Sequence, residues 1–148
     1  MVTRCGPIGT IVMRLPSGEE LMALENPFVW HELVTSDQKS SGGFFARLFG
    51  WARREVDAGP FGTYTLFQVN GSDIAGMMNP TSDSPAGGSY WHTYFAVEDV
   101  DACAQRALQL GGRVLVAPHD VQDVGRICAV SDPTGAVAHL LQTIQSRA

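Results

Sequence analysis

The sequence has few cysteines, few basic residues and no long hydrophobic run, and each shortage excludes a class of protein. Its three cysteines, Cys5, Cys103 and Cys128, lie far apart and form no CxxC pair. This spacing argues against a disulfide framework and against a thiolate metal site, and buried free thiols are the simpler interpretation. No uninterrupted apolar run approaches the ~18 residues that span a bilayer. We therefore expect no membrane partner.

The scarcity of basic residues limits the possible partners further. The 148 residues include ten Lys and Arg against fifteen Asp and Glu, which gives a formal net charge of -5, and the cations are scattered. A chain without a basic patch is not expected to bind nucleic acid. The N-terminal stretch MVTRCGPIGTIVMRLPSG has Arg4 and Arg14 within it and no small-residue cleavage site after it, which argues against a signal peptide and predicts a cytoplasmic protein.

What the sequence does contain is an internal repeat. A displacement of 62 residues superimposes Leu33 on Phe95, Asp37 on Asp99, and Gly50 on Gly112. Each half begins with an extended run, continues with a helix that starts after the aspartate and stops at the glycine, and ends with three short extended stretches. The pattern predicts an α+β protein made of two tandem βαβββ modules, residues 28–79 and 89–143, with a linker at 80–88 rich in Pro, Gly and Ser.

Two segments fit this pattern less well. Residues 1–27 have no counterpart in the repeat, and we assign them to an N-terminal extension of unknown role ahead of a single domain, residues 28–148. Gly42 and Gly43 lie inside the first predicted helix. Each glycine costs about 1 kcal/mol relative to alanine, so this helix is expected to start late or to fray.

The duplication, together with the motifs FGW, AVEDVDA, LGGRV and DPTGA, resembles the vicinal oxygen chelate superfamily. This group includes glyoxalase I, bleomycin-resistance proteins, fosfomycin-resistance enzymes and extradiol dioxygenases. The resemblance covers residues 28–143. It implies a cupped mixed sheet with the helices outside and the site inside the cup. Metal-using members hold a divalent ion there through up to four side chains, from the first and last strand of each module.

Two Trp-His pairs, Trp30-His31 and Trp91-His92, look like copies of one another but are one residue out of step. The 62-residue displacement places His92 on Trp30. Because strand side chains alternate between faces, Trp30 and His92 are expected to face the cup, whereas His31 faces away as a surface or hydrogen-bonded histidine.

The second module supplies histidines at both positions where the resemblance implies metal ligands, His92 in its first strand and His139 in its last. The first module offers Trp30 and either Ala75 or Met77 there. None of these three side chains binds a hard divalent ion. The resemblance therefore implies a lopsided site.

Glu32 is the residue that could complete this site, because it lies on the same strand face as Trp30, and Asp73 is a second choice. A catalytic divalent ion needs about three protein ligands and an open position. Two alternatives stay open. Either His92, His139 and Glu32 hold one divalent metal (Zn, Ni, Fe, Mn or Co), or no metal is bound and Glu32 acts as a general base whose pKa is tuned by burial.

The remaining candidates are substrate-binding residues. Trp30, Tyr94, Phe67 and Met77 are expected to give the cup aromatic and apolar walls, although Phe67 and Met77 could equally be ordinary core. Arg126, on the predicted strand GRICAVS, could point at an anionic ligand or lie on the surface.

Two functions are consistent with these residues. One is an enzyme with lyase, isomerase or dioxygenase chemistry on a small molecule, like the glyoxalases and dioxygenases. The alternative is a binding protein of the bleomycin-resistance kind, which sequesters a small aromatic or polar compound between Trp30 and Tyr94 without turnover. In either case exposed sheet edges favour a homodimer.

Overall fold

The computed structural model describes residues 28–143, so the predicted N-terminal extension lies outside the described part of the chain. In the first module the elements are β1 (Phe28–Val34), α2 (Gln38–Phe49), β2 (Ala52–Asp57), the 3-10 turn η1 (Gly59–Phe61), β3 (Thr63–Val69) and β4 (Ser72–Met78). In the second they are β5 (Tyr90–Ala96), α3 (Val100–Gln109), β6 (Arg113–Val121), β7 (Gly125–Ser131) and β8 (Val137–Thr143).

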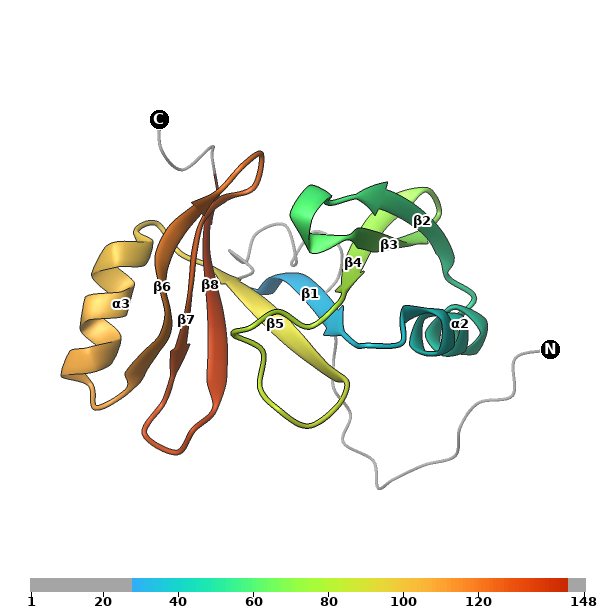
Figure 1. The fold of residues 1–148 in the computed structure, drawn as a ribbon. Coiled ribbons are helices and arrows are strands. Elements are labelled where there is room, and N and C mark those ends of the chain that lie inside the picture. The colour runs from blue at the N-terminus through green and yellow to red at the C-terminus, as the bar shows by residue number, and fades with distance from the viewer. Residues whose placement is uncertain (1–27, 144–148) are drawn as a thin grey trace, which may run out of the picture.

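The eight strands of residues 28–143 form one mixed sheet in the order β2-β3-β4-β1-β5-β8-β7-β6. The first strands of the two modules, β1 and β5, pair antiparallel at its centre, and each runs parallel to the last strand of its own module (Figure 1). His31 lies opposite Thr93, 62 residues away. The displacement read from the sequence is therefore an approximate twofold relation between the modules, and the predicted α+β architecture of two βαβββ units is confirmed.

Each helix begins at the aspartate that the sequence predicts. Asp37 accepts a hydrogen bond from the Ser40 amide and Asp99 accepts one from the Ala102 amide, which satisfies free donors in the first turn. Helix α2 ends at Gly50, whose φ of 72° is the left-handed conformation that favours glycine. In the part of the chain that is described, no helix is both long enough and apolar enough to cross a membrane.

Helix α2 continues through Gly42 and Gly43, so the expectation of a late or frayed start is wrong. Gly42 is buried, and a Cβ added to it would lie 2.6 Å from the terminal methyl carbon of Met77. The missing side chain lets the helix approach β4 closely. Packing against the sheet thus offsets the low helix propensity of glycine.

Both helices pack on the same side of the sheet, which we call the helix face, and the opposite side is the inner face. The buried core on the helix face consists of Leu33, Phe67, Ala75 and Met77 in the first module and of Val100, Ala104, Cys128, Val130 and Leu140 in the second. Helix α3 packs on β6, β7 and β8, whereas α2 contacts mainly β4.

The positions of Phe67 and Met77 correct the expectation that they line the cup. Both lie in the core on the helix face, with 0% and 1% of their surface exposed. The β3–β4 pairing slips between Phe67 and Gln68, because the extra residue Ile74 forms a bulge in β4. One extra residue moves every following side chain of the strand to the other face.

Candidate functional site

A buried carboxylate lies at the centre of the inner face. The β1–β5 register places Glu32 opposite His92, and the Glu32 Oε1 atom is 2.7 Å from the His92 Nε2 atom. Tyr94 Oη donates to Oε1 at 3.2 Å and Tyr64 Oη donates to Oε2 at 2.7 Å. Trp30 Nε1 in turn donates to Tyr64 Oη at 3.1 Å. Only 7% of the Glu32 side chain and 13% of the His92 side chain are exposed, so the carboxylate depends on these donors rather than on water.

Two opposing influences act on the acidity of Glu32. Burial raises its pKa, but the hydrogen bonds from His92 and Tyr64, the charge of His92 and the bond from Tyr94 together outweigh burial and hold the pKa below its usual value. Glu32 is therefore ionised near neutral pH. An ionised carboxylate only accepts hydrogen bonds, so the His92 Nε2 atom must carry the proton that they share.

This assignment leaves the other ring nitrogen of His92 without a partner. The Nδ1 atom is buried and makes no hydrogen bond. In a neutral imidazole whose Nε2 atom carries the hydrogen, Nδ1 presents a lone pair. An unpartnered buried nitrogen next to an ionised carboxylate is uncommon in ordinary protein interiors and calls for an explanation.

Two tyrosines also bond the carboxylate, Tyr94 at the oxygen that His92 bonds and Tyr64 at the other oxygen. Burial, followed by the negative charge of Glu32, raises the pKa of both Tyr64 and Tyr94. Both phenols therefore stay protonated and serve as donors. Tyr64 reaches Glu32 only because residue 76 is glycine, since a Cβ on Gly76 would lie 1.7 Å from the Tyr64 hydroxyl oxygen.

Gly76 is also the first-module counterpart of His139. Gly76 pairs with Glu32 across the parallel strands β1 and β4. In the second module, His139 pairs with Tyr94 across the parallel strands β5 and β8. Glu32 and Tyr94 are equivalent positions because they are 62 residues apart, so Gly76 and His139 are equivalent as well. The two residues expected at this position, Ala75 and Met77, lie on the helix face. The last strand of the first module therefore brings no polar side chain to the site.

His139 is the nearest aromatic neighbour of His92, with the two ring centroids 3.9 Å apart. Burial, and secondarily the charge of nearby His92, lowers the pKa of His139 to about 4. At neutral pH this imidazole is uncharged. The twofold relation thus brings Glu32, His92 and His139, from β1, β5 and β8, to one place on the inner face.

The sequence profile of the Glyoxalase/Bleomycin resistance protein/Dioxygenase superfamily matches residues 27–140, which is most of the chain and nearly all of the two modules. The chain belongs to this superfamily. The fold described above is the fold of its members, because the methylmalonyl-CoA epimerase of Mycobacterium tuberculosis superposes with a TM-score of 0.55 at 18% identity, over 80% of this chain and 90% of that one.

Relatives of higher identity within the superfamily are longer proteins. The chain is 36% identical over 115 residues to the Mycobacterium bovis protein named "Putative glyoxylase CFP32", an alignment that covers 76% of this chain and 44% of the relative. It is 33% identical over 119 residues to the "Anthracycline biosynthesis protein DnrV" of Streptomyces peucetius, covering 72% of this chain and 43% of the relative. The chain spans less than half the length of these relatives.

The donor set does not fit the metal centre of metal-using superfamily members. Glu32 Oε1 binds the Nε2 atom of His92, so this carboxylate cannot meet an ion at the opposite ring nitrogen, Nδ1. Within residues 28–143, no three His, Cys, Asp or Glu side chains are arranged to hold an ion. Asp73, the second choice from the sequence, is bonded to Arg54 and Gln68 instead. Because a catalytic ion needs about three ligands, these side chains do not form a metal centre in this arrangement.

Arg126 lies away from this site, contrary to the expectation that it could point at a ligand there. Its guanidinium binds Asp101 of α3, with the Nη2 to Oδ1 distance 2.8 Å, and Asp120 of β6. Arg126 has the same strand parity as the core residue Cys128, which places it on the helix face. It is therefore paired on the outside of the second module.

The one-residue offset between the Trp-His pairs is visible in the structure. Trp30 and His92 bond to the network on the inner face, whereas His31 bonds the Thr93 hydroxyl at 3.1 Å and Trp91 packs against Phe45 of α2. Sequence reasoning missed Tyr64 and Gly76. No local pattern marks either residue, because their contact depends on the bulged β3–β4 register.

The lowered pKa of His139 gives a testable pH dependence of stability. The unfolded chain takes up this proton below about pH 6.5, whereas the folded chain does not until about pH 4, so the stability that neutral His139 confers is lost as the pH falls through this window. After a discount for its partial exposure, we expect a loss of about 1–2 kcal/mol. Urea unfolding of wild type and of His139→Gln between about pH 4 and 6.5 measures this loss. If the free energy of unfolding fell equally with pH in both proteins, the lowered pKa of His139 would be refuted.

Proposed function

We propose that the chain is an acid–base enzyme that moves a proton on a small carbonyl compound, with His92 as the proton acceptor and Glu32 as the residue that orients it. The observation that carries the proposal is the buried Nδ1 atom of His92, which has no partner while Nε2 is bonded to an ionised carboxylate. This arrangement fixes the tautomer of the imidazole and leaves one nitrogen available as a base.

The proton transfer follows from the charges on the inner face. His92 Nδ1 takes a proton from a carbon next to the substrate carbonyl, and the electron pair of the broken C–H bond moves into the enolate. The imidazolium that forms is stabilised by Glu32 at 2.7 Å, and it returns the proton to the enolate at the same or at another atom. Tyr64 and Tyr94 keep the carboxylate ionised throughout the cycle.

Access to His92 is limited by its neighbours. The His139 ring lies 3.9 Å from the His92 ring, centroid to centroid, and 13% of the His92 side chain is exposed. A substrate therefore reaches Nδ1 only when side chains around the His92 ring move, and His139, Tyr90 and Tyr94 are its aromatic neighbours among the described residues. Trp30 and Tyr94 remain the substrate-binding residues that we propose for this face, because both bond to the Glu32 network.

The names of the relatives guide the choice of substrate. They are a glyoxylase and an anthracycline biosynthesis protein, and both names point to small carbonyl compounds. Hydroxyketones and polycyclic aromatic ketones are accordingly the first compounds to test. Pairing as a homodimer is part of the proposal, since β2 and β6 are the edges of the described sheet.

Deuterium exchange tests the proposal without knowledge of the natural substrate. Chelator-treated protein is incubated in D2O with a panel of such ketones, and mass spectrometry measures deuterium gained at carbon. We expect His92→Gln and Glu32→Gln to slow exchange of any accepted ketone by about 100-fold or more, the usual contribution of a positioned base. His119→Gln, which changes an exposed histidine, should exchange at the wild-type rate.

Two outcomes would replace the proposal. Exchange that appears only after Zn, Ni, Fe, Mn or Co is added would indicate a metal-dependent site formed by rearrangement of Glu32, His92 and His139. Tight binding of a panel compound with no exchange in any variant would favour sequestration, the alternative function that the sequence left open.

A further inference from the structure

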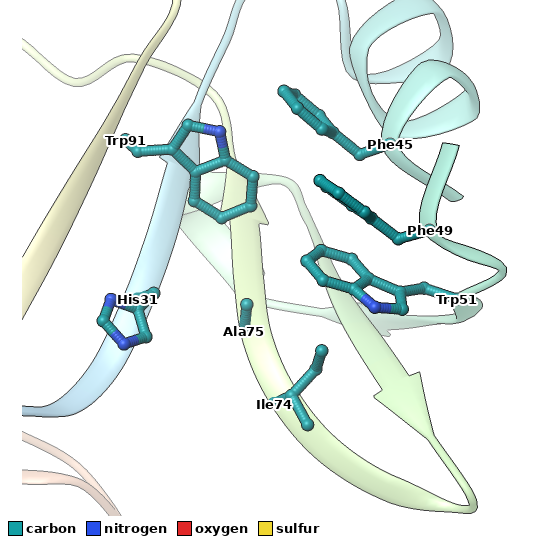
Figure 2. Close-up of a pocket in the computed structure, with 7 residues that line it drawn as sticks. All are labelled: His31, Phe45, Phe49, Trp51, Ile74, Ala75 and Trp91. Atoms are coloured by element: carbon teal, nitrogen blue, oxygen red, sulfur yellow. The ribbon is translucent and has the colours of Figure 1, made fainter. Parts of the chain in front are cut away.

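A second place on the molecule has the form of a small-molecule site, and it lies on the helix face of the first module. A pocket of about 490 Å³ opens between α2 and the central strands. Figure 2 shows Phe45, Phe49 and Trp51 on one side of it, Trp91 across from them, and His31 near its lower edge. Strand alternation separates it from Glu32, which lies on the inner face.

The pocket exists because the two modules pack their helices differently. Helix α3 covers β6, β7 and β8, whereas α2 contacts mainly β4. The 62-residue displacement places Phe45 where the second module has Ala107, which packs against its core. The larger Phe45 ring meets Trp91 of β5 edge-on, with the ring centroids 5.2 Å apart. Trp91 and Phe49 are 39% and 54% exposed, although both are large aromatic residues.

The lining defines the chemistry of a ligand. Aromatic rings form both walls, with the Phe45 and Phe49 planes at 12° to one another and Trp91 edge-on to Phe45. His31 is the polar residue among the lining side chains, and its Nδ1 atom bonds the Thr93 hydroxyl at 3.1 Å, which fixes the ring and leaves Nε2 for a ligand. An apolar cavity of this size with one oriented polar group is typical of small-molecule sites.

We infer that this pocket binds a flat, uncharged aromatic compound that carries one hydroxyl or carbonyl group. The rings stack against or meet the edges of the aromatic walls, and the oxygen bonds the Nε2 atom of His31. The absence of any Lys, Arg, Asp or Glu among the lining residues disfavours a charged ligand. The site is independent of the proton transfer proposed for His92.

The three tryptophans of the chain make the test specific. Trp51 and Trp91 line the pocket, and Trp30 lies in the Glu32 network on the other face. Titration of the full chain with 2-naphthol is followed by the three indole N–H signals in nitrogen-edited NMR spectra, assigned with Trp→Phe variants. The signals of Trp51 and Trp91 should shift together while that of Trp30 stays in place.

Matched compounds and variants complete the experiment. Decahydro-2-naphthol, which has the same hydroxyl but no flat rings, should bind about tenfold more weakly. Phe49→Ala should weaken 2-naphthol binding about five- to tenfold, whereas Phe44→Ala should leave it unchanged. Phe44 is 55% exposed on the same helix but does not line the pocket.

Three results would overturn the inference. A shift of Trp30 without shifts of Trp51 and Trp91 would place the compound on the inner face. Equal effects of Phe44→Ala and Phe49→Ala would show unspecific contact with α2. No shift of Trp51 and Trp91 by millimolar 2-naphthol would show that the pocket does not take a compound of this class.

Discussion

Replacement of His92 by leucine is expected to lower the free energy of unfolding by about 3–5 kcal/mol near neutral pH, because it removes one of the two shortest hydrogen bonds to a buried charge. The His92 Nε2 atom lies 2.7 Å from Glu32 Oε1, and the Glu32 side chain is 7% exposed. Leucine fills similar space but offers no donor. Tyr64 and Tyr94 continue to bond the carboxylate, which limits the loss to this range. Urea unfolding measures it.

The pH dependence of this loss separates charge from packing. In the wild type the lowered pKa of Glu32 stabilises the fold above about pH 4.5, and this contribution is lost as the pH falls through the lower folded value. Without His92, burial is opposed only by the tyrosines, and we expect the pKa to rise above its usual value. The folded variant then holds a proton that the unfolded chain has lost, so its stability decreases as the pH rises.

The difference in free energy of unfolding between wild type and His92→Leu should therefore be larger at about pH 8 than at about pH 5. His31→Leu is the matched control, since His31 is an exposed histidine on the other face whose hydrogen bond to Thr93 is worth about 1 kcal/mol or less. A stability deficit that is the same at both pH values would show that His92 contributes through packing, and its hydrogen bond to Glu32 would then carry little of the stability.

The contact between Glu32 and His92 could be predicted from the sequence, because it depends on helix caps, on the internal repeat and on strand alternation. The Asp37 and Asp99 caps and the 62-residue displacement define the register of β1 and β5, and that register decides that His92 rather than His31 meets Glu32. Alternation with period two then follows from strand geometry. His139 was predicted at the site by the resemblance to the superfamily, and the structure places it beside His92.

The sequence predictions were wrong where a side chain's position depends on a β-bulge or on a partner that is distant in the sequence. The bulge at Ile74 in β4 moves Met77 to the helix face and brings Gly76 to the inner face, and Phe67 of β3 pairs with Ala75 on the helix face. The position of the Arg126 side chain is set by its bond to Asp101 of α3, a partner that no local sequence pattern reveals. Hydrogen-bond networks between distant strands, such as the one that fixes the ionisation of Glu32, are properties of packing rather than of local sequence.

Substitution of Gly76 by alanine is expected to lower the free energy of unfolding by about 2–4 kcal/mol, although alanine suits a strand better than glycine does. The added Cβ would lie 1.7 Å from the Tyr64 hydroxyl oxygen and 2.3 Å from the ring carbon that bears it, so Tyr64 must leave its position. Its movement breaks the bonds to Glu32 and from Trp30. A lost charge-assisted bond costs about 1.5–3 kcal/mol, and overpacking adds to it.

A double-mutant cycle tests whether Tyr64 is the cause. In a Tyr64→Leu background the shorter side chain does not reach residue 76, so Gly76→Ala should cost less than about 1 kcal/mol there or even stabilise the strand slightly. Loss of the Tyr64 bond should also raise the pKa of Glu32, because burial is then opposed by fewer donors. Carbon-13 NMR titration of the Glu32 carboxyl measures this change. If Gly76→Ala were equally costly in both backgrounds, the glycine would be needed for the backbone of β4, and Tyr64 would not hold Glu32 in the way that the structure indicates.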